Sequence, residues 1–219
     1  MIDEEHGIFL LADGMGGHNA GEVASDIAVK EAYAFILNKI EQADDEHAVL
    51  AVMEEALLRA HRAVQARAAS DDALYGMGTT LVELYIRGGN GFVCHAGDSR
   101  AYLFRSTLQR ITRDHTFGDT HAAYGPRDGE KVPQRMRHAL TQAVGPRNCP
   151  VPDVKSIELL SGDILLLCSD GLTDMLGDDE IQDIISDHNG EMGSVVEALV
   201  REANNKGGRD NISLIAAMR

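Results

Sequence analysis

Apolar residues in the first third of the chain follow a strand pattern and then two helical patterns. Ile8 to Ala12 form a short apolar run that predicts a strand, and a glycine-rich segment ends this run. Helical spacing of apolar residues follows from Ala20 to Ile36 and again from Glu46 to Ala68. This part is therefore predicted to form a strand, a glycine loop and two helices.

The middle of the chain changes to an apolar period of two, which predicts β-strands. Turns rich in Gly, Asn, Asp and Ser divide it into four short strands, expected to form one antiparallel meander over residues 80–87, 92–96, 100–105 and 108–112. The polar segment from Asp114 to Arg137 is too long for an ordinary connection and predicts a mobile surface flap.

The last third combines strands and helices again. Ile157 to Leu160 and Asp163 to Ser169 flank a Ser-Gly turn and predict a hairpin, whose second strand is apolar on both faces and therefore central. Helices are expected over Asp178 to Ser186 and Ser194 to Asn205, and a final strand over Asn211 to Met218.

The order of these elements predicts an α+β fold. Helix pairs are separated by runs of strands without βαβ alternation, which favours an antiparallel β-sandwich covered by helices on both sides. The chain has 219 residues, of which 44% are hydrophobic, and this is enough for one domain with a substantial core. We therefore expect one domain over residues 1–219.

Composition and charge narrow the classes of function. Twenty basic and 35 acidic residues give a net charge of −15, which argues against nucleic-acid binding and anionic membranes as partners. The sequence has neither an apolar stretch of about 20 residues nor a signal-peptide pattern, so a cytoplasmic location is expected. Cys94, Cys149 and Cys168 lack metal-site spacing and are expected to be reduced, mostly structural thiols.

Four aspartates, Asp13, Asp98, Asp170 and Asp210, lie at junctions between strands and turns. Each is explained singly by a turn or by pairing with a neighbouring arginine. Together they suggest carboxylates that converge on one site. Two carboxylates about 4 Å apart repel by roughly 4 kcal/mol at an effective dielectric constant near 20. Such a cluster needs protons or bound cations, and hard divalent cations are the ones that carboxylates usually bind.

Seven segments, taken in chain order, carry a resemblance to a known family. They resemble the bacterial form of the metal-dependent serine/threonine protein phosphatases of type 2C, and they read LLADGMGGHNAGEVAS, MGTTLV, CHAGDSRAYL, RITRDHT, LTQAVG, GDILLLCSDGLTD and GRDNISLIA. The resemblance runs from about Gly7 to Ala217. It implies a four-layer α-β-β-α sandwich, in which two antiparallel sheets are flanked by helix pairs.

The resemblance also implies a metal centre with two Mn²⁺ or Mg²⁺ ions at one end of the sandwich. Carried over to this sequence, Asp13 bridges both metals, the Gly14 carbonyl binds one of them, and Asp170 and Asp210 hold the other. Asp98, with Asp170, matches the position of a third, weaker metal. The implied reaction is hydrolysis of phosphoserine and phosphothreonine by a metal-activated water.

His18 matches a histidine of the bacterial motif near the substrate, where a proton donor to the leaving alkoxide is useful. Met15 stands where many eukaryotic members carry a histidine. The segment from Thr116 to Arg137 corresponds to the variable flap of the family, which influences substrate access. The family's usual N-terminal strands carry a phosphate-binding Arg and an Asn-Glu-Asp segment that helps to hold the second metal, and neither matches a residue here.

Without those strands, we expect an unpaired edge beside Ile8 to Ala12, through which copies of the chain could associate. Asp3, Glu4 and Glu5 are interpreted as solvated residues of a hairpin turn before Gly7.

The expected partners are phosphorylated serine/threonine proteins, made by a bacterial serine/threonine kinase. Two alternatives stay open. The chain could be a catalytically impaired, phosphatase-like binding protein, because the second-metal carboxylate is missing, or it could hydrolyse small phosphoesters.

Overall fold

Two antiparallel sheets form the centre of the molecule in the computed structural model, which describes all residues except 17, 125–132, 134–135, 147 and 189–190. The first sheet has the order β1-β2-β5-β6-β9 and consists of Ile2–Asp3, Ile8–Leu11, Leu81–Arg87, Asn90–Ala96 and Asp153–Glu158. The second has the order β11-β10-β7-β8 and consists of Leu214–Met218, Ile164–Cys168, Arg100–Phe104 and Leu108–Arg110. A small two-stranded sheet pairs β3 (Gly14–Met15) with β4 (Gly78–Thr79).

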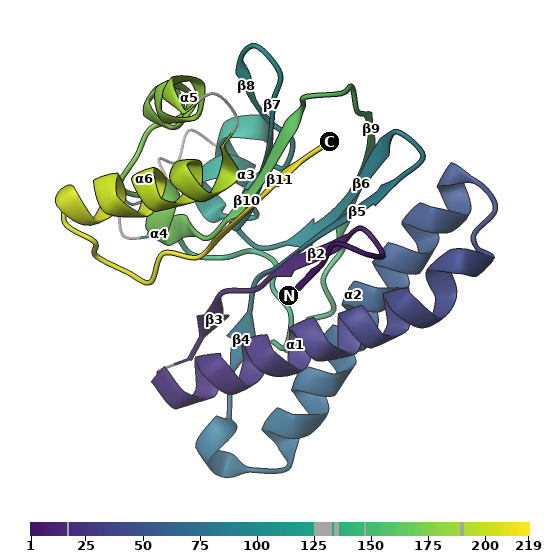
Figure 1. Ribbon diagram of the computed structural model, residues 1–219. Helices are drawn as coiled ribbons and strands as arrows, with labels where there is room; N and C mark the ends of the chain where they lie inside the picture. Colours follow the sequence, from purple (N-terminus) through teal and green to yellow (C-terminus); the bar gives the residue numbers. More distant parts are fainter. Residues whose placement is uncertain (17, 125–132, 134–135, 147, 189–190) are drawn as a thin grey trace.

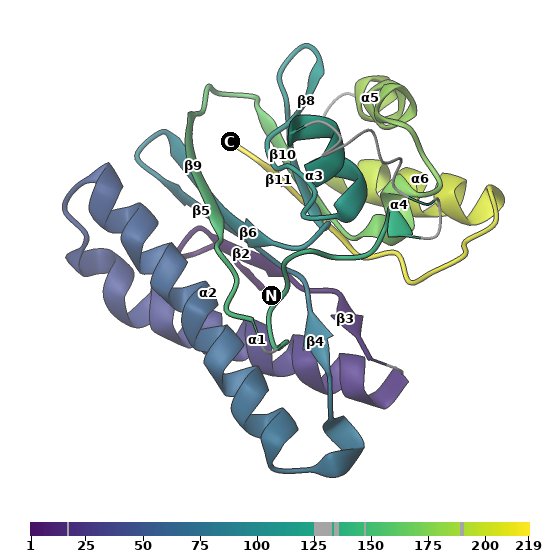
Figure 2. The same cartoon turned by 180° about the vertical axis from the view of Figure 1, so that it is seen from behind.

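Helix pairs cover the two outer faces, as Figures 1 and 2 show from opposite sides. On the first sheet lie α1 (His18–Lys39) and α2 (Glu46–Ala69), and on the second lie α5 (Asp178–Asp187) and α6 (Met192–Asn205). The shorter helices are α3 (Phe117–Tyr124), α4 (Asp170–Thr173) and two 3-10 turns at Ile40–Gln42 and Asp72–Leu74. The predicted four-layer α-β-β-α sandwich is confirmed. None of the described helices has the length and apolar character of a membrane span.

Three apolar clusters fill the spaces between these four layers. One lies between the sheets, and one lies under each helix pair. β10 contributes to two of them, because Leu165 and Leu167 face the other sheet while Leu166 and Cys168 face the helices. Its neighbours are β7 and β11, so the prediction of a central strand is confirmed. This placement explains why the strand is apolar on both faces.

α1 approaches its neighbours closely through small side chains. Ala20, Ala24, Ala28 and Ala32 repeat every four residues and are buried, so they form one face of the helix. α2 begins at its N-cap Asp45, whose side chain accepts the backbone N–H of Ala48. Both predicted N-terminal helices are confirmed.

The chain crosses between the sheets at two places where the sequence pattern predicted hairpins. β6 pairs with β5 and β9, whereas β7 pairs with β10 and β8, so the predicted meander is broken at Gly97 to Ser99. The predicted hairpin around Ser161-Gly162 is wrong for the same reason, because β9 and β10 belong to different sheets. Period-two patterns identify strands but not the sheet they join. The first crossing places Asp98 at one end of the sandwich.

A short hairpin covers the edge of β2. Ile2 pairs with Phe9, and the backbone groups of Met1 and Leu10 also bond to each other. The edge beside Ile8 to Ala12 is therefore not open, which corrects the expectation from sequence. The interpretation as exposed residues of a hairpin turn is confirmed for Glu4 and Glu5. It is wrong for Asp3, which belongs to β1 and accepts a hydrogen bond from the Tyr33 hydroxyl.

The predicted flap contains one described helix, α3. The rest of that prediction lies largely outside the described residues.

Candidate metal centre

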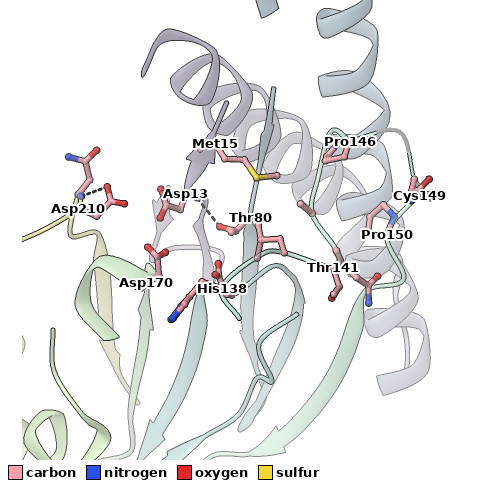
Figure 3. A pocket seen from close by; sticks show the side chains of 17 residues that line it. Asp13, Met15, Thr80, His138, Thr141, Pro146, Cys149, Pro150, Asp170 and Asp210 are labelled. Atoms are coloured by element: carbon pink, nitrogen blue, oxygen red, sulfur yellow. Dashed lines mark hydrogen bonds between the residues drawn. The ribbon is translucent and has the colours of Figure 1, made fainter. Parts of the chain in front are cut away.

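All four predicted aspartates line a single cavity of about 560 Å³ at one end of the sandwich. Asp13 follows β2, Asp98 lies in the crossing from β6 to β7, Asp170 begins α4 directly after β10, and Asp210 lies before β11. Figure 3 shows Asp13, Asp170 and Asp210 at one end of this cavity. The prediction that these carboxylates converge is confirmed.

Burial and mutual repulsion disfavour the ionised carboxylates. Burial, followed by the charge of Asp170, raises the pKa of Asp13 to about 7. Burial and the same neighbour raise the pKa of Asp98 to about 7. The pKa of Asp170 is also raised, chiefly by burial, with Asp174 and Asp210 adding repulsion. A cation would relieve this repulsion.

One oxygen of Asp170 provides an independent indication of a ligand. Its Oδ1 is buried and has no hydrogen-bond partner among the described residues. A buried acceptor left in this state costs about 1–3 kcal/mol, and more when it is charged. Carboxylate oxygens are the preferred ligands of Mg²⁺ and also suit Mn²⁺. The residues of this cavity therefore fit a divalent-cation centre.

Hydroxyl groups on neighbouring segments tie two of the aspartate-bearing turns together. Thr80 Oγ1 accepts the backbone N–H of Asp13 at 2.9 Å and lies 2.7 Å from Ser99 Oγ. Thr79 Oγ1 donates to the Asp13 carbonyl at 2.8 Å, and the Thr80 N–H donates to the same oxygen. These side chains hold the end of β2 beside the turn that carries Asp98.

The glycines after Asp13 allow close packing of the loop on α1. A Cβ on Gly14 would lie 2.1 Å from the backbone oxygen of Gly21, and a Cβ on Gly21 would lie 2.8 Å from Gly14. Neither position tolerates a side chain without a backbone shift. Close packing of the loop on α1 therefore explains why glycine stands at positions 14 and 21. At Gly14 the lack of a side chain also leaves the exposed backbone accessible to a ligand.

A second cavity of about 640 Å³ adjoins the first and shares Asp98, Asp170 and an exposed histidine, His138. Asp174 and the ion pair of Arg100 with Asp114 also line it. The Arg100 guanidinium contacts both oxygens of Asp114, at 2.7–3.2 Å. Arg100 is the arginine that neighbours Asp98 in the sequence, but its ion pairs are with Asp114 and, at 3.9 Å, Asp178.

The remaining site predictions have mixed outcomes. His18 begins α1, but its side chain lies outside the described residues. Met15 lines the cavity. Asp210 accepts the N–H of its neighbour Asn211 and is exposed.

Sequence reasoning missed the wall opposite the aspartates, which Figure 3 shows with Thr141, Pro146, Cys149 and Pro150. It also missed the scaffold of Thr79, Thr80 and Ser99. The adjacent hydroxyls in the MGTT and GDS segments were the available signal, but their partners are 19 to 67 residues away.

The comparisons with known proteins agree with this geometry. A family described as Protein phosphatase 2C matches residues 2–209. Protein phosphatase PhpP of Streptococcus pneumoniae is 37% identical over 213 residues, which cover 94% of this chain and 83% of PhpP.

Among solved structures, PppA of Pseudomonas aeruginosa superposes with a TM-score of 0.82 at 30% identity, covering 100% of this chain and 89% of PppA. The catalytic domain of the serine/threonine phosphatase PstP, in complex with two manganese ions, gives 0.79 at 32% identity, covering 96% and 86%. The convergent aspartates, the sandwich and these similarities agree, and the chain belongs to the protein phosphatase 2C family.

Proposed function

We propose that this chain removes phosphate from phosphoserine and phosphothreonine in proteins at a centre built on the four aspartates. The observation that carries the proposal is the convergence of Asp13, Asp98, Asp170 and Asp210 in one cavity, where burial and repulsion raise the pKa of Asp13 and Asp98 to about 7. Family membership supports the reaction. Bound Mn²⁺ or Mg²⁺ supplies an activated water and neutralises charge on the phosphoryl oxygens.

The proposed ligands come from segments that adjoin β2, β7, β10 and β11. Asp13 would bridge two cations and the Gly14 carbonyl would bind one, while Asp170 and Asp210 would hold the other. Asp98 would join Asp170 at a third, weaker position. The buried, unpartnered Oδ1 of Asp170 supports its role as a ligand.

The protein groups then have the tasks of placing and protonating the substrate. The cavity has room for a phosphorylated side chain, and its far wall is formed by uncharged residues such as Thr141 and Pro150. His18 is proposed to give a proton to the leaving serine or threonine oxygen. This role stays a prediction.

The decisive test compares Asp170→Asn with the wild type and with Asp183→Asn, a matched control on the exposed surface of α5. We expect Asp170→Asn to lower the rate of Mn²⁺-dependent phosphate release from a phosphothreonine peptide by at least about 100-fold, as for loss of a group that stabilises transition-state charge. Asp183→Asn should retain the wild-type rate. Equal rates for Asp170→Asn and the wild type would refute the proposed centre.

The same assay separates the alternative functions. A chain that hydrolyses p-nitrophenyl phosphate but not the peptide would be a small-phosphoester hydrolase. A chain that binds the peptide and hydrolyses neither would be a phosphatase-like binding protein.

The finer assignments of partner and place are also proposals. We propose that the phosphoproteins are products of a bacterial serine/threonine kinase and that the chain acts in the cytoplasm. Self-association stays a prediction, although its expected surface beside β2 is covered by β1. Dephosphorylation of kinase-treated proteins and a sedimentation measurement would test the first and last of these.

A further inference from the structure

A histidine pair with an aspartate lies behind the turn that carries Asp98. His95 lies one residue before the end of β6, His115 follows β8, and Asp153 begins β9. Both imidazoles are 3% exposed, and one potential ligand atom from each of the three side chains lies within 4.8 Å of the others. Such proximity could indicate a metal site or a hydrogen-bonded group, and the geometry of the rings distinguishes these two possibilities.

The ring geometry does not suit a shared metal. His95 and His115 stack with centroids 4.6 Å apart and planes only 14° apart. An imidazole binds a metal such as Zn²⁺ at about 2.0–2.1 Å, along the lone pair of a nitrogen and in the plane of the ring. Lone pairs in two nearly parallel planes do not converge on one ion at that distance. The trio is therefore better described as a hydrogen-bonded group.

The hydrogen bonds of His115 specify one tautomer. Its Nδ1 lies 3.3 Å from the backbone nitrogen of Gly97, which can only donate, so Nδ1 must accept. The proton of the neutral ring is then on Nε2, which lies 3.2 Å from Asp153 Oδ2 and donates to it. His95 Nε2 donates to the Arg113 carbonyl at 2.9 Å. The stacked His95 ring thus stays fixed behind His115.

Both backbone polar groups of Gly97 are bonded to His115. The His115 N–H donates to the Gly97 carbonyl at 3.0 Å, and the Gly97 N–H donates to Nδ1. Gly97 has φ +116°, and a Cβ there would lie 2.6 Å from Thr80 Cγ2. The turn is therefore packed against Thr80 on one side and held by His115 on the other.

His115 also reaches the far wall of the metal centre. Its carbonyl accepts the N–H of Thr141 at 2.8 Å, and Thr141 lines the cavity that contains the four aspartates. The preceding residue, Asp114, is the one paired with Arg100. His115 thus connects the turn that carries Asp98 with the wall of the cavity that contains Thr141.

We propose that His115 is a positioning residue for the metal centre. In this role its Nδ1 holds the Gly97–Asp98 turn, and Asp153 maintains the tautomer that makes this bond possible. The inference rests on the proposed function, because it assumes that Asp98 is a ligand. His115 itself touches neither substrate nor metal.

Two substitutions of His115 distinguish the role of its Nδ1 from the role of its Nε2. In His115→Asn the side-chain oxygen can occupy the place of Nδ1 and accept the Gly97 N–H, whereas in His115→Gln the amide reaches the place of Nε2. We expect the asparagine variant to retain Mn²⁺ affinity within about threefold at the site that Asp98→Asn abolishes. The glutamine variant should lose about 10- to 100-fold there, as when a supporting hydrogen bond of a ligand is removed.

If His115 acted only through the packing of its ring, Mn²⁺ affinity and amide exchange would change equally in the two variants, because both remove the stacked imidazole. Calorimetric Mn²⁺ titration gives the affinities, and amide hydrogen exchange of Gly97 gives a readout without metal. Exchange should be faster in His115→Gln than in His115→Asn. Equal affinities and equal exchange in the two variants would overturn the proposal.

The tautomer is measured directly by the ¹⁵N chemical shifts of His115 in the metal-free wild type. The proposal requires the Nε2–H form, and the Nδ1–H form would overturn it. The exchange and tautomer measurements do not depend on the proposed function. If Asp98→Asn leaves all Mn²⁺ binding unchanged, the ligand assignment of Asp98 fails, and these two measurements still decide whether His115 holds the turn.

Discussion

Glu83 places a carboxyl group in the apolar layer under α1 and α2. It lies in the middle of β5, opposite Leu10 on β2 and Cys94 on β6, and both of these neighbours belong to the cluster under the helices. Glu83 is 0% exposed, and neither of its oxygens has a hydrogen-bond partner among the described residues. Burial raises its pKa well above the ordinary value of 4.5.

Replacement of Glu83 by leucine should stabilise the protein. Each buried polar atom without a partner costs about 1–3 kcal/mol, and Glu83→Leu removes two such atoms while adding apolar contact. We expect the free energy of unfolding at pH 7.5 to rise by roughly 2 kcal/mol or more. Urea denaturation followed by circular dichroism, with a chelator present, measures this difference.

The pH dependence of stability tests the cause. Below pH 4.5 the Glu83 carboxyl is neutral in both states. As the pH rises above 4.5, the unfolded chain loses this proton first, because the folded pKa is raised. The equilibrium constant for folding therefore falls by up to about tenfold per pH unit, until the pH passes the pKa of Glu83 in the folded protein. Glu83→Gln has no such proton and should not show this loss.

The comparison of the wild type with Glu83→Gln isolates this proton, because other titrating groups are common to both proteins. The difference in unfolding free energy should grow from pH 5 to pH 8 in favour of glutamine. A constant difference over this range would refute the assignment of a buried, neutral carboxyl. A leucine variant less stable than the wild type would refute the claim that the group is unpartnered.

Three further substitutions probe the site and its supports. Arg100→Gln removes the bidentate partner of the Asp114 carboxylate, which is 10% exposed, and leaves it only Arg110 at 3.7 Å, so the unfolding free energy should fall by about 1–3 kcal/mol in urea denaturation. Gly21→Ala should push the Gly14 backbone away and weaken Mn²⁺ binding in calorimetry. The melting temperature of the metal-free protein should change little. Asp13→Asn should stabilise the metal-free protein, more at pH 8 than at pH 5, because the raised pKa of Asp13 makes its ionisation unfavourable when folded. Unchanged Mn²⁺ affinity in Gly21→Ala would contradict the second prediction. Stabilisation of Asp13→Asn by the same amount at pH 5 and pH 8 would contradict the third.

The local pattern of the sequence was enough to find most elements and the main candidates for the site. Alternating or continuous apolar runs identified β5, β6, β7 and β10, and helical spacing identified α1 and α2. The four aspartates were recognisable because each follows or precedes such a run at a glycine or small polar residue.

Pairing between distant segments could not be predicted in this way. Period-two patterns do not show that β6 and β7 lie in different sheets, because either sheet buries the same alternation of side chains. The roles of Thr80 and His115 depend on contacts with residues 18 to 67 positions away. Neither residue differs in type from many surface threonines and histidines.

By itself, the sequence indicated an antiparallel sandwich covered by helices through its local periodicity, and its ordered motifs carried the resemblance that implied the family, the four layers and the metal-binding carboxylates. Only the tertiary structure decided that the four carboxylates line one cavity, that burial and then repulsion raise the pKa values of Asp13, Asp98 and Asp170, and that a histidine bonds to one of their turns. The physical reason is distance. Burial, electrostatic repulsion and hydrogen bonding depend on separations of a few ångströms, and these separations are set by how the two sheets pack.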